Sequence, residues 1–568
     1  MPASIEDSLE HNLNKVAAEL QQASFPEAMV AAMRSFARQV RESITIAVIG
    51  QVKAGKSSLV NALLGCELPT IGVTETTATV NWFRYGSPND EDHVFCYRGG
   101  TKQPSRHPVS FLENLQGDSA AVLKRIANID RLEFRLPVDW LQNLILVDTP
   151  GFNSASKEHQ DVAALFAGLA SQLRDRNIRE TERLAREADA VVYITSANPH
   201  AVDRNILEEF QSRVQGSGAF TAIAVVGKLD FHDPDPTMWP RRAASVGKQL
   251  QHLVADVVTV SAGIHLIAER FRRNGQALAL FRRFINLPSA GEFEILIGSE
   301  IRFKSEDAFS LTIPERIAML GNAPWPAFEI AAKLGRNEFK DAAGDFFSRL
   351  DSIAGIDALK ESINQNFVSR GSILRCCRIA RDAETLVQEQ GWSYIRHCEG
   401  LDVGERQKCG HFQEFLQRIS PAVLPQDRAT AAELAQFVSA QLENANRAAR
   451  ARAVVAEISR LLGICRRDVE ISLPDLASIR LTNETAAVLP ASIAEEFRVL
   501  FGCVGQDPQI CFSGNEDVSG YITERGRYWR TAYHADNRVQ TLYTRAAERY
   551  SILLHRLQSS IHPKEKSV

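Results

Sequence analysis

The sequence predicts an α/β domain, with a mostly parallel sheet covered by helices on both faces, followed by an elongated all-α domain. In the first half, short apolar β-branched segments alternate with helical ones, the pattern of such a sheet. The strand signal fades after about residue 263, and helical patterns dominate from residue 371. A chain of 568 residues is also too long for one hydrophobic core, so two or more structural units are expected.

The first predicted strand covers residues 44–49, a short run of apolar and β-branched residues that ends at Gly50. Another strand candidate ends at Val260. Helical stretches separate several strands, most clearly 160–186 and 201–213. The remaining predicted strands are 79–84, 93–98, 131–136, 144–148, 190–195 and 222–227.

Three regions are predicted along the chain. Residues 1–40 form N-terminal helices, which Pro26 separates because proline fits the start of a helix and not its interior. Residues 41–370 form the α/β domain, with 264–353 as an insertion and 354–367 as its last helix. Within that insertion, 264–284 is expected to be helical and 285–325 irregular. Residues 371–568 form the helical domain, with its tip near 466–524.

Composition narrows the function classes. The net charge of −4 provides no global basic field, so we expect no nucleic-acid partner. The acidic N-terminus has no apolar signal region, and no run of about 18 apolar residues occurs. The nine cysteines show no metal-binding spacing and fit a reducing compartment. We therefore expect a cytoplasmic protein, with peripheral membrane contact left open.

The strongest motif follows the first strand and precedes a predicted helix. It reads G-x-x-x-x-G-K-S, a P-loop, whose backbone N–H groups close around phosphate oxygens at the positive end of a helix. Lys56 should reach the β- and γ-phosphates, and Ser57 should offer its hydroxyl to Mg²⁺. The predicted nucleotide-binding residues here are Gly50, Gln51, Val52, Lys53, Ala54, Gly55, Lys56, Ser57 and Ser58.

A second motif, Asp-Thr-Pro-Gly at 148–151, ends the strand at 144–148. Asp148 can hold a Mg²⁺-bound water, and the Gly151 N–H can sense the γ-phosphate. Between the two motifs lie Thr74, Thr76 and Thr77, whose hydroxyls are candidates to reach Mg²⁺. A segment of this kind is ordered by γ-phosphate and Mg²⁺ and released after hydrolysis. The predicted metal ligands are Ser57, Thr77 and Asp148.

A third motif, Gly-Lys-Leu-Asp at 227–230, ends another strand and predicts the choice of base. The Asp230 carboxylate can accept hydrogen bonds from N1–H and N2–H₂ of guanine, a donor pair that adenine lacks. The Lys228 stem would lie over the base, and the loop at Ser261 resembles one that offers a main-chain N–H to guanine O6. The ligands predicted for this site are GTP or GDP with Mg²⁺.

With these motifs in order, the sequence resembles the dynamin superfamily, in particular bacterial dynamin-like proteins. The resemblance covers about residues 41–263 and is carried by 50–65, 68–80, 148–161 and 227–230. It implies a large GTPase that hydrolyses GTP slowly and whose GTPase domains pair as a homodimer across the nucleotide. It also implies a helical neck, joined by the N-terminal helices, and a stalk at 371–568; many members remodel membranes.

The chain departs from the family pattern at the catalytic positions. Val52 stands where dynamins carry a catalytic glutamine, and that role is not transferred to Gln51. Lys53 stands where the sister family of guanylate-binding proteins carries an arginine finger, and as a point charge it lacks the planar fork of arginine. Gly227 replaces the usual Thr or Asn, whose side chain ties the base-binding loop to the P-loop. The catalytic candidates are Lys56, Lys53 and Thr77.

Three functions stay open at this point. The first is a GTP-hydrolysing dynamin-like machine that acts peripherally on membranes. The second, which Val52 and Gly227 favour, is a nucleotide-gated scaffold with little hydrolysis that switches binding to a protein partner. The third, a ribosome-associated GTPase, is disfavoured by the near-neutral charge. The amphipathic stretch 486–505 suits either a membrane interface or, as such helices more often do, a core.

Overall fold

The structure of the protein is a computed structural model. It divides into two compact units, Ser43–Gly371 and a second unit formed by Met1–Glu42 with Ser372–Val568. The residues that it describes are 5–51, 54–65, 79–98, 103–115, 122, 125–126, 128–149, 188–199, 201–212, 221–250, 253–287, 289–307, 309–339, 343–398, 403–419, 428–470, 478, 481–482, 485, 488–502, 512 and 517–561.

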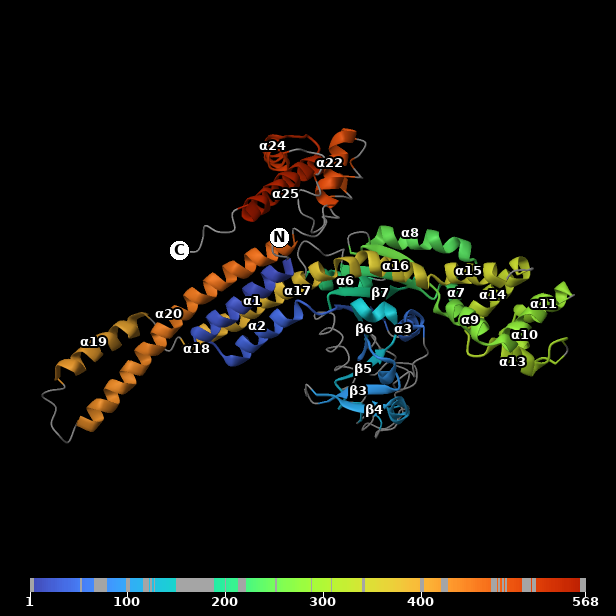
Figure 1. The fold of residues 1–568 in the computed structure, drawn as a ribbon, viewed down its shortest axis with the longest axis horizontal. Coiled ribbons are helices and arrows are strands. Elements are labelled where there is room, and N and C mark those ends of the chain that lie inside the picture. The colour runs from blue at the N-terminus through green and yellow to red at the C-terminus, as the bar shows by residue number, and fades with distance from the viewer. Residues whose placement is uncertain are drawn as a thin grey trace. The chain divides into compact units, whose positions relative to one another are not determined.

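A sheet organises the first unit, and its strands within the described residues run in the order β4-β3-β5-β2-β6-β1-β7-β8-β9 (Figure 1). The pairs β6-β1, β1-β7, β7-β8, β8-β9 and β2-β5 are parallel, whereas β2-β6, β3-β5 and β3-β4 are antiparallel. The mostly parallel sheet is therefore confirmed, and β4 is a strand that the sequence pattern did not predict. The strands are β1 (Ile44–Gly50), β2 (Asn81–Tyr85), β3 (His93–Tyr97), β4 (Ser105–Pro108), β5 (Arg131–Leu136), β6 (Leu144–Asp148), β7 (Ala190–Thr195), β8 (Ala222–Gly227) and β9 (Asp256–Val260).

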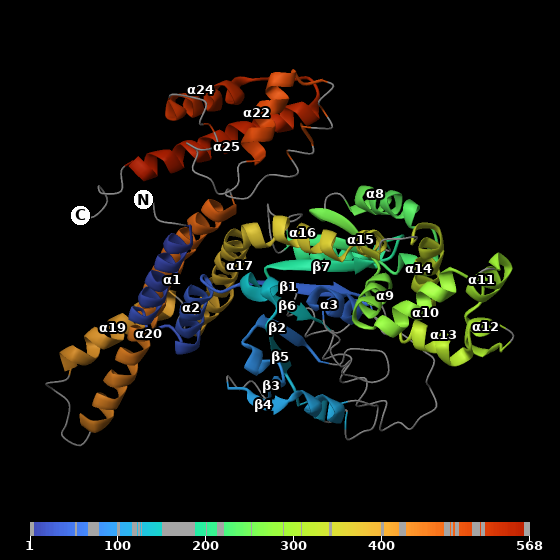
Figure 2. The same cartoon turned by 45° about the vertical axis from the view of Figure 1, so that its right-hand side comes forward.

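Helices pack against the sheet (Figure 2): α3 contacts β1 and β6, α8 and α16 both contact β9, and α3 and α16 also contact each other, so these two helices lie on one face. The predicted helix at 160–186 lies outside the described residues. The helices of this unit are α3 (Lys56–Leu64), α6 (Ala201–Ser212), α7 (Leu229–His232), α8 (Trp239–Leu250), α9 (Ala262–Arg273), α10 (Gly275–Ile285), α11 (Ala290–Ile297), α12 (Glu300–Ser305), α13 (Ile313–Leu320), α14 (Trp325–Glu338), α15 (Ala343–Ala354) and α16 (Ile356–Asn366).

The central strands are almost wholly apolar because both of their faces are covered. Every residue of β6 and β7 is buried, which is the pattern expected of strands inside a parallel sheet. Gly50, at the end of β1, lies so close to β7 that a Cβ on it would stand 2.9 Å from the Ile194 carbonyl oxygen. The close approach of these two strand ends brings the P-loop beside the residues that follow β7.

A helical lobe, α9–α15, extends the first unit beyond β9. The prediction that 285–325 is irregular was wrong, since α11, α12 and α13 occupy most of it. Ser289, Ser299 and Thr312 cap these three helices, and Thr312 forms a capping box with Glu315. Each helix has eight residues or fewer, too short to show a helical period in the sequence.

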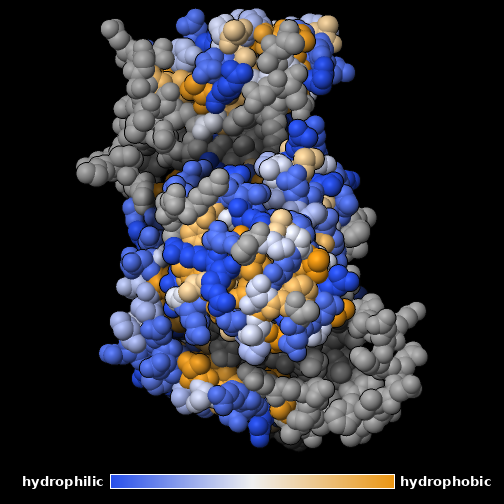
Figure 3. All heavy atoms as spheres, turned by 90° about the vertical axis from the view of Figure 1, so that its right-hand side faces the viewer, coloured by the Kyte–Doolittle hydropathy of each residue, from blue (hydrophilic) through white to orange (hydrophobic). Residues whose placement is uncertain are grey.

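Aromatic packing dominates the core of the helical lobe, which is continuous with the core of the sheet. Its fully buried rings are those of Phe271, Phe281, Phe284, Phe293, Phe303, Phe328 and Phe346. On the outside, Ile295, Ile301 and Ile317 are exposed. Figure 3, which views the end of the unit at which the lobe lies, shows apolar side chains interspersed with polar ones.

The second unit contains a helical bundle made from both ends of the sequence. Arg375 on α17 donates to the Val40 carbonyl at 2.8 Å and to the Glu6 carboxylate at 2.8 Å. Phe25 packs against Tyr394 with ring centroids 4.6 Å apart. The bundle consists of α1 (Ile5–Gln22), α2 (Glu27–Gln39), α17 (Gly371–Leu386), a π-helical turn (Val387–Gly391), α18 (Trp392–Cys398), α19 (Val403–Ile419) and α20 (Arg428–Glu470).

A C-terminal cluster is formed by α22 (Ala491–Gly502), α24 (Val518–Thr531) and α25 (Asn537–Ile561). The structure describes 488–502 of the amphipathic stretch 486–505, and there Phe497, Leu500 and Phe501 are fully enclosed. These side chains form a core and no exposed apolar surface, while the location of a stalk tip near 466–524 stays a prediction.

Among the described residues, no helix combines the length and the apolarity needed to cross a bilayer.

Candidate nucleotide-binding site

The P-loop lies between β1 and α3, at the carboxyl edge of the parallel strands. Gly55 adopts a positive φ of 94° at the N-cap of α3, a conformation that glycine adopts without strain. Because β1 pairs with both β6 and β7, the loop adjoins the ends of these two strands. The edge of a parallel sheet beside a helix N-terminus is a favourable position for phosphate groups.

Lys56 already points into its own loop. Its side-chain ammonium donates to the carbonyl oxygens of Gly50 at 3.2 Å and Gln51 at 3.0 Å, and the residue is only 6% exposed. Burial lowers the pKa of Lys56 to about 8, although the nearby Asp148 carboxylate acts in the opposite direction. The side chain is therefore charged at neutral pH and held where phosphate oxygens can reach it.

Ser57 and Asp148 meet at the end of β6. The Ser57 hydroxyl donates to Asp148 Oδ2 at 3.0 Å, and Asp148 is 2% exposed. Burial raises the pKa of Asp148 to about 6, against the effect of Lys56 and of its hydrogen bonds with Ser57 and Asn81. Its other oxygen, Oδ1, is buried and has no hydrogen-bond partner among the described residues.

The oxygens of Ser57 and Asp148 fit a Mg²⁺ ion. Magnesium prefers hard oxygen ligands, takes few from the protein and keeps several waters. A serine hydroxyl beside a buried carboxylate with one uncommitted oxygen provides such a partial shell. The ion would also neutralise a carboxylate whose burial is otherwise costly.

Thr149, the second residue of the D-T-P-G motif, is fully buried. Its hydroxyl donates to the Val48 carbonyl of β1 at 2.8 Å. This bond fixes the chain as it leaves β6 and so supports the position of Asp148. The motif predicts roles for its Asp and Gly, and a threonine beside a strand end carries no sequence signal for this hydrogen bond.

A cavity of about 250 Å³ lies where the guanine base is predicted. Asp230, in α7, is 5% exposed, and burial raises its pKa, while a hydrogen bond from Ser261 lowers it. Lys228 has a positive φ of 56°, and its Cε would stand 3.5 Å from a Cβ on Gly55, so its stem lies along the P-loop. The cavity is lined by Ala54, Gly55, Ser58, Leu59, Ile194, Val225, Gly227, Lys228, Asp230, Phe231, Val260, Ala262, Gly263 and Pro324.

Ser261 positions this site through its side chain and its backbone. Its amide donates to the Ala354 carbonyl at 3.0 Å, and its hydroxyl accepts from the Ile264 amide at 3.2 Å as the N-cap of α9. Because the Ser261 N–H is already bonded, it is not free for guanine O6. The neighbouring Ala262 lines the cavity and is the better candidate for that main-chain donor.

The helical lobe contributes one wall of the base cavity. Pro324, which precedes α14, lines it together with Gly263 of α9. A Cβ on Gly263 would stand 2.9 Å from Ala327 Cβ and 3.2 Å from Asp230 Oδ2, so glycine allows α9 and α14 to approach the carboxylate. No sequence motif marks Pro324, which lies 94 residues beyond Asp230 in the chain.

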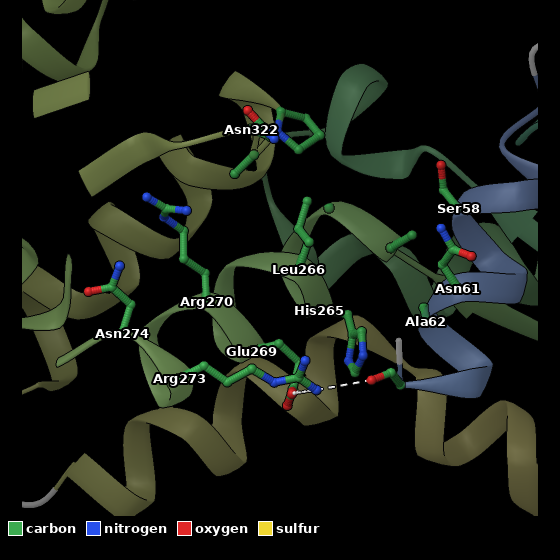
Figure 4. A pocket seen from close by; sticks show the side chains of 15 residues that line it. Ser58, Asn61, Ala62, His265, Leu266, Glu269, Arg270, Arg273, Asn274 and Asn322 are labelled. Atoms are coloured by element: carbon green, nitrogen blue, oxygen red, sulfur yellow. Dashed lines mark hydrogen bonds and ion pairs between the residues drawn. The ribbon is translucent and has the colours of Figure 1, made fainter. Parts of the chain in front are cut away.

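A second cavity, of about 640 Å³, adjoins the first and shares Ser58, Ala262, Gly263 and Pro324 with it (Figure 4). It opens between α3 and α9. Figure 4 shows Arg273 of α9 reaching the end of α3, where it donates to the Gly65 carbonyl at 2.9 Å. The lobe is thus bonded directly to the helix that begins with Lys56.

Gln51 makes hydrogen bonds within the protein, and its predicted contact with the nucleotide stays a prediction. Its carbonyl accepts from Lys56, while its side chain donates to Asp203 of α6 at 3.0 Å. Asp203 follows no recognisable motif, and sequence reasoning did not find it.

Several predicted site residues lie outside the described part of the chain: Val52, Lys53, Thr74, Thr76, Thr77 and Gly151. Their proposed roles in phosphate binding, metal binding and catalysis stay predictions. The described residues nevertheless bring together the predicted Lys56, Ser57 and Asp148 at one end of the site and Lys228, Asp230 and Ser261 at the other.

The raised pKa of Asp148 predicts a pH dependence. Below about pH 6 the carboxyl of the nucleotide-free protein is protonated, so Mg²⁺ must displace a proton to bind. The Mg²⁺-dependent gain in affinity for a fluorescent GDP analogue should fall by up to about tenfold per pH unit between pH 6 and pH 5. Fluorescence titrations with and without Mg²⁺ measure it. Asp148→Asn is the control, since any pH dependence that remains in this variant belongs to the nucleotide. If the Mg²⁺-dependent gain in affinity of the unchanged protein is the same at pH 6 and pH 5, the assignment of Asp148 is contradicted.

Gly227 has no side chain, so a substitution that adds a hydrogen-bond donor there is expected to strengthen GDP binding. A Cβ there would stand 3.7 Å from the Ala54 carbonyl oxygen and 3.3 Å from Ile194 Cγ2. The amide of Gly227→Asn can donate to that carbonyl and tie the two loops together, worth about 1 kcal/mol, or roughly fivefold tighter GDP binding. Gly227→Ala adds the Cβ without the donor, and an equal gain in it would rule out the hydrogen bond as the cause.

The comparison with family models gives a match over residues 46–229 to the dynamin family. This segment runs from β1 to α7 and so contains the P-loop and Asp148, and it ends one residue before Asp230.

Similar curated proteins match over part of the molecule. The isoniazid-induced protein IniC of Mycobacterium tuberculosis is 32% identical over 199 residues, which are 34% of this chain and 35% of IniC. An uncharacterized protein in the xynA 3' region of a Caldicellulosiruptor species is 28% identical over 173 residues, 29% of this chain and 37% of that protein. The match thus spans little more than a third of these relatives.

Among solved structures, an oligomerised bacterial dynamin pair aligns with 85% of this chain and 94% of its own at 12% identity, with a TM-score of 0.29. Era of Aquifex aeolicus bound to GDP and AlF4⁻ aligns with 39% of this chain and 52% of its own at 16% identity, with a TM-score of 0.22. Scores this low carry no argument about fold or function, so the family match and the site geometry provide the evidence. On that evidence, residues 46–229 match the dynamin family, and they carry the geometry of a guanine-nucleotide-binding GTPase domain.

Proposed function

We propose that this protein is a dynamin-like GTPase that hydrolyses GTP with Mg²⁺ and couples the nucleotide cycle to pairing of its GTPase domains and to membrane remodelling. One observation carries the proposal: Lys56, Ser57 and Asp148 converge at one end of the site, and within the described part of the chain Asp148 Oδ1 has no hydrogen-bond partner. A charged lysine beside oxygen atoms that can ligate Mg²⁺ is the arrangement that phosphoryl transfer requires.

In this proposal Lys56 neutralises charge that develops on the β- and γ-phosphates. Ser57 and Asp148 hold the metal ion, which supplies charge stabilisation when bound. Asp230 selects guanine, and the Ser261 hydroxyl holds the Asp230 carboxylate in place. Thr77 and Lys53 remain the candidates for completing the γ-phosphate side.

Pairing of GTPase domains would complete the active site. The chain has Val52 in the place of the family's catalytic glutamine, so its own P-loop offers no amide at that position to orient water. A group supplied by a second copy can be worth about 10³–10⁵ in rate. We infer a homodimer in the GTP-bound state, with slow turnover by the isolated chain.

The first test is GTP hydrolysis across a hundredfold range of protein concentration. Turnover per protein should rise at least about tenfold, and Lys56→Ala should lower it by about a hundredfold or more. Released phosphate is measured, with Asp230→Asn in XTP as a control for catalytic competence without guanine recognition. Turnover that stays flat with concentration would contradict pairing. Absence of hydrolysis under every condition would favour the nucleotide-gated scaffold instead.

The membrane part of the proposal is supported by an exposed apolar surface on α19 and α20. These two helices pack together, and Phe412 and Phe415 on α19 and Leu434 and Phe437 on α20 are exposed. Each pair is spaced i,i+3 and shares one face of its helix. Large apolar side chains exposed in groups mark interaction sites, and phenylalanine partitions well into the acyl region of a bilayer.

Liposome pelleting tests this surface. Phe415 and Phe437 are 52% and 62% exposed, and changing both to serine should remove about 2 kcal/mol of apolar transfer each. The fraction that sediments with vesicles of phosphatidylethanolamine and phosphatidylglycerol should then fall to the level without vesicles. Tyr533→Ser, at a residue 83% exposed in the turn between α24 and α25, is the matched control. If the double variant pellets like the unchanged protein, this surface does not bind membrane.

A further inference from the structure

A buried hydrogen-bond network joins the P-loop to α6. Asp203, in the first turn of α6, is 1% exposed and accepts from Gln51 at 3.0 Å and from the Tyr193 hydroxyl at 2.6 Å. The Thr195 hydroxyl lies 3.4 Å from its other oxygen. Burial and the Asp203 carboxylate both raise the pKa of Tyr193, so its hydroxyl stays protonated and donates. A buried carboxylate needs such donors, and the P-loop supplies one of them.

The same residue, Gln51, holds the essential lysine. Its carbonyl accepts from Lys56 Nζ at 3.0 Å and from the Ala54 amide at 3.2 Å. Its side chain is fixed by Asp203, so rotation of the Gln51 peptide is opposed at both ends of the residue. Gly50, which precedes Gln51, is packed against β7. The hydrogen bond from the Gln51 side chain to Asp203 restrains Gln51 on its other side.

We propose that Gln51 and Asp203 are positioning residues, which hold the P-loop and Lys56 in the conformation that receives the phosphates of guanine nucleotide. The Gln51 side chain does not touch nucleotide in this role. The inference rests on nucleotide binding and is independent of hydrolysis, of domain pairing and of membranes.

The geometry offers a test in which a negative charge is added at position 51 and a negative charge is then removed at position 203. Gln51→Glu places a second carboxylate against the buried Asp203, so the two groups repel and the loop must move. Asp203→Asn restores a donor, since an amide nitrogen in the place of Oδ1 can donate one hydrogen to the carboxylate introduced at position 51 and the other to the Tyr193 hydroxyl, which then accepts. Gln51→Met keeps the side-chain length and removes the donor without adding charge.

Affinity for a fluorescent GDP analogue is the readout, measured with Mg²⁺ at about pH 7.5 on the full chain. We expect Gln51→Glu to weaken binding about thirtyfold, Asp203→Asn and Gln51→Met about threefold, and the Gln51→Glu/Asp203→Asn pair to recover to within about threefold. Thermal unfolding midpoints of each variant separate lost positioning from lost folding. If Gln51→Glu does not fold, Gln51→Met and the double variant still give the comparison.

Two results would overturn the proposal. If Gln51→Glu weakens binding and Asp203→Asn does not restore it, the added charge acts on the phosphates directly and Gln51 faces the nucleotide. If Gln51→Met and Gln51→Glu bind like the unchanged protein, the network has no effect on the P-loop. Neither result bears on hydrolysis, and a chain that binds GDP without turning over GTP would leave this inference intact.

Discussion

The nucleotide site depends on keeping an ammonium and a carboxylate buried at the edge of one sheet. Lys56 and Asp148 are almost inaccessible, and burial shifts their pKa values toward the neutral forms, to about 8 and about 6. Each is tolerated because the other is near and because backbone carbonyls and Ser57 supply hydrogen bonds. Phosphate and a metal ion then bind groups that folding has already desolvated. The site is preorganised in this physical sense.

Three buried aspartates at this edge differ in role because they differ in partners. Asp148 has one oxygen that no described residue binds, and it can take a cation. Asp230 faces a cavity and can take the donors of a base. Asp203 accepts from Gln51 and Tyr193 and serves the protein itself. Residue type and burial are shared, so function follows from which donors the fold places around each carboxylate.

The helical lobe takes part in the nucleotide site. It contacts the site at Pro324, at the Ala354 carbonyl that binds Ser261, and at Arg273, which bonds the end of α3. Movement of the lobe would therefore change the base cavity and the P-loop helix together. Such a direct mechanical connection is one way in which nucleotide state can be communicated across a GTPase domain.

Sequence alone determined the parts that depend on neighbours in the chain. The strand, turn and helix around Lys56, and the strand ends at Asp148 and Asp230, each lie within a few residues, so local pattern and motif predicted them together with the mostly parallel sheet. Tertiary structure decided what depends on distant residues. It paired Gln51 with Asp203, 152 positions away, buried the apolar face of α22 against α24 and α25, and formed α11–α13 from segments too short to show a period. Side-chain partners across such distances follow from packing, which no local pattern encodes.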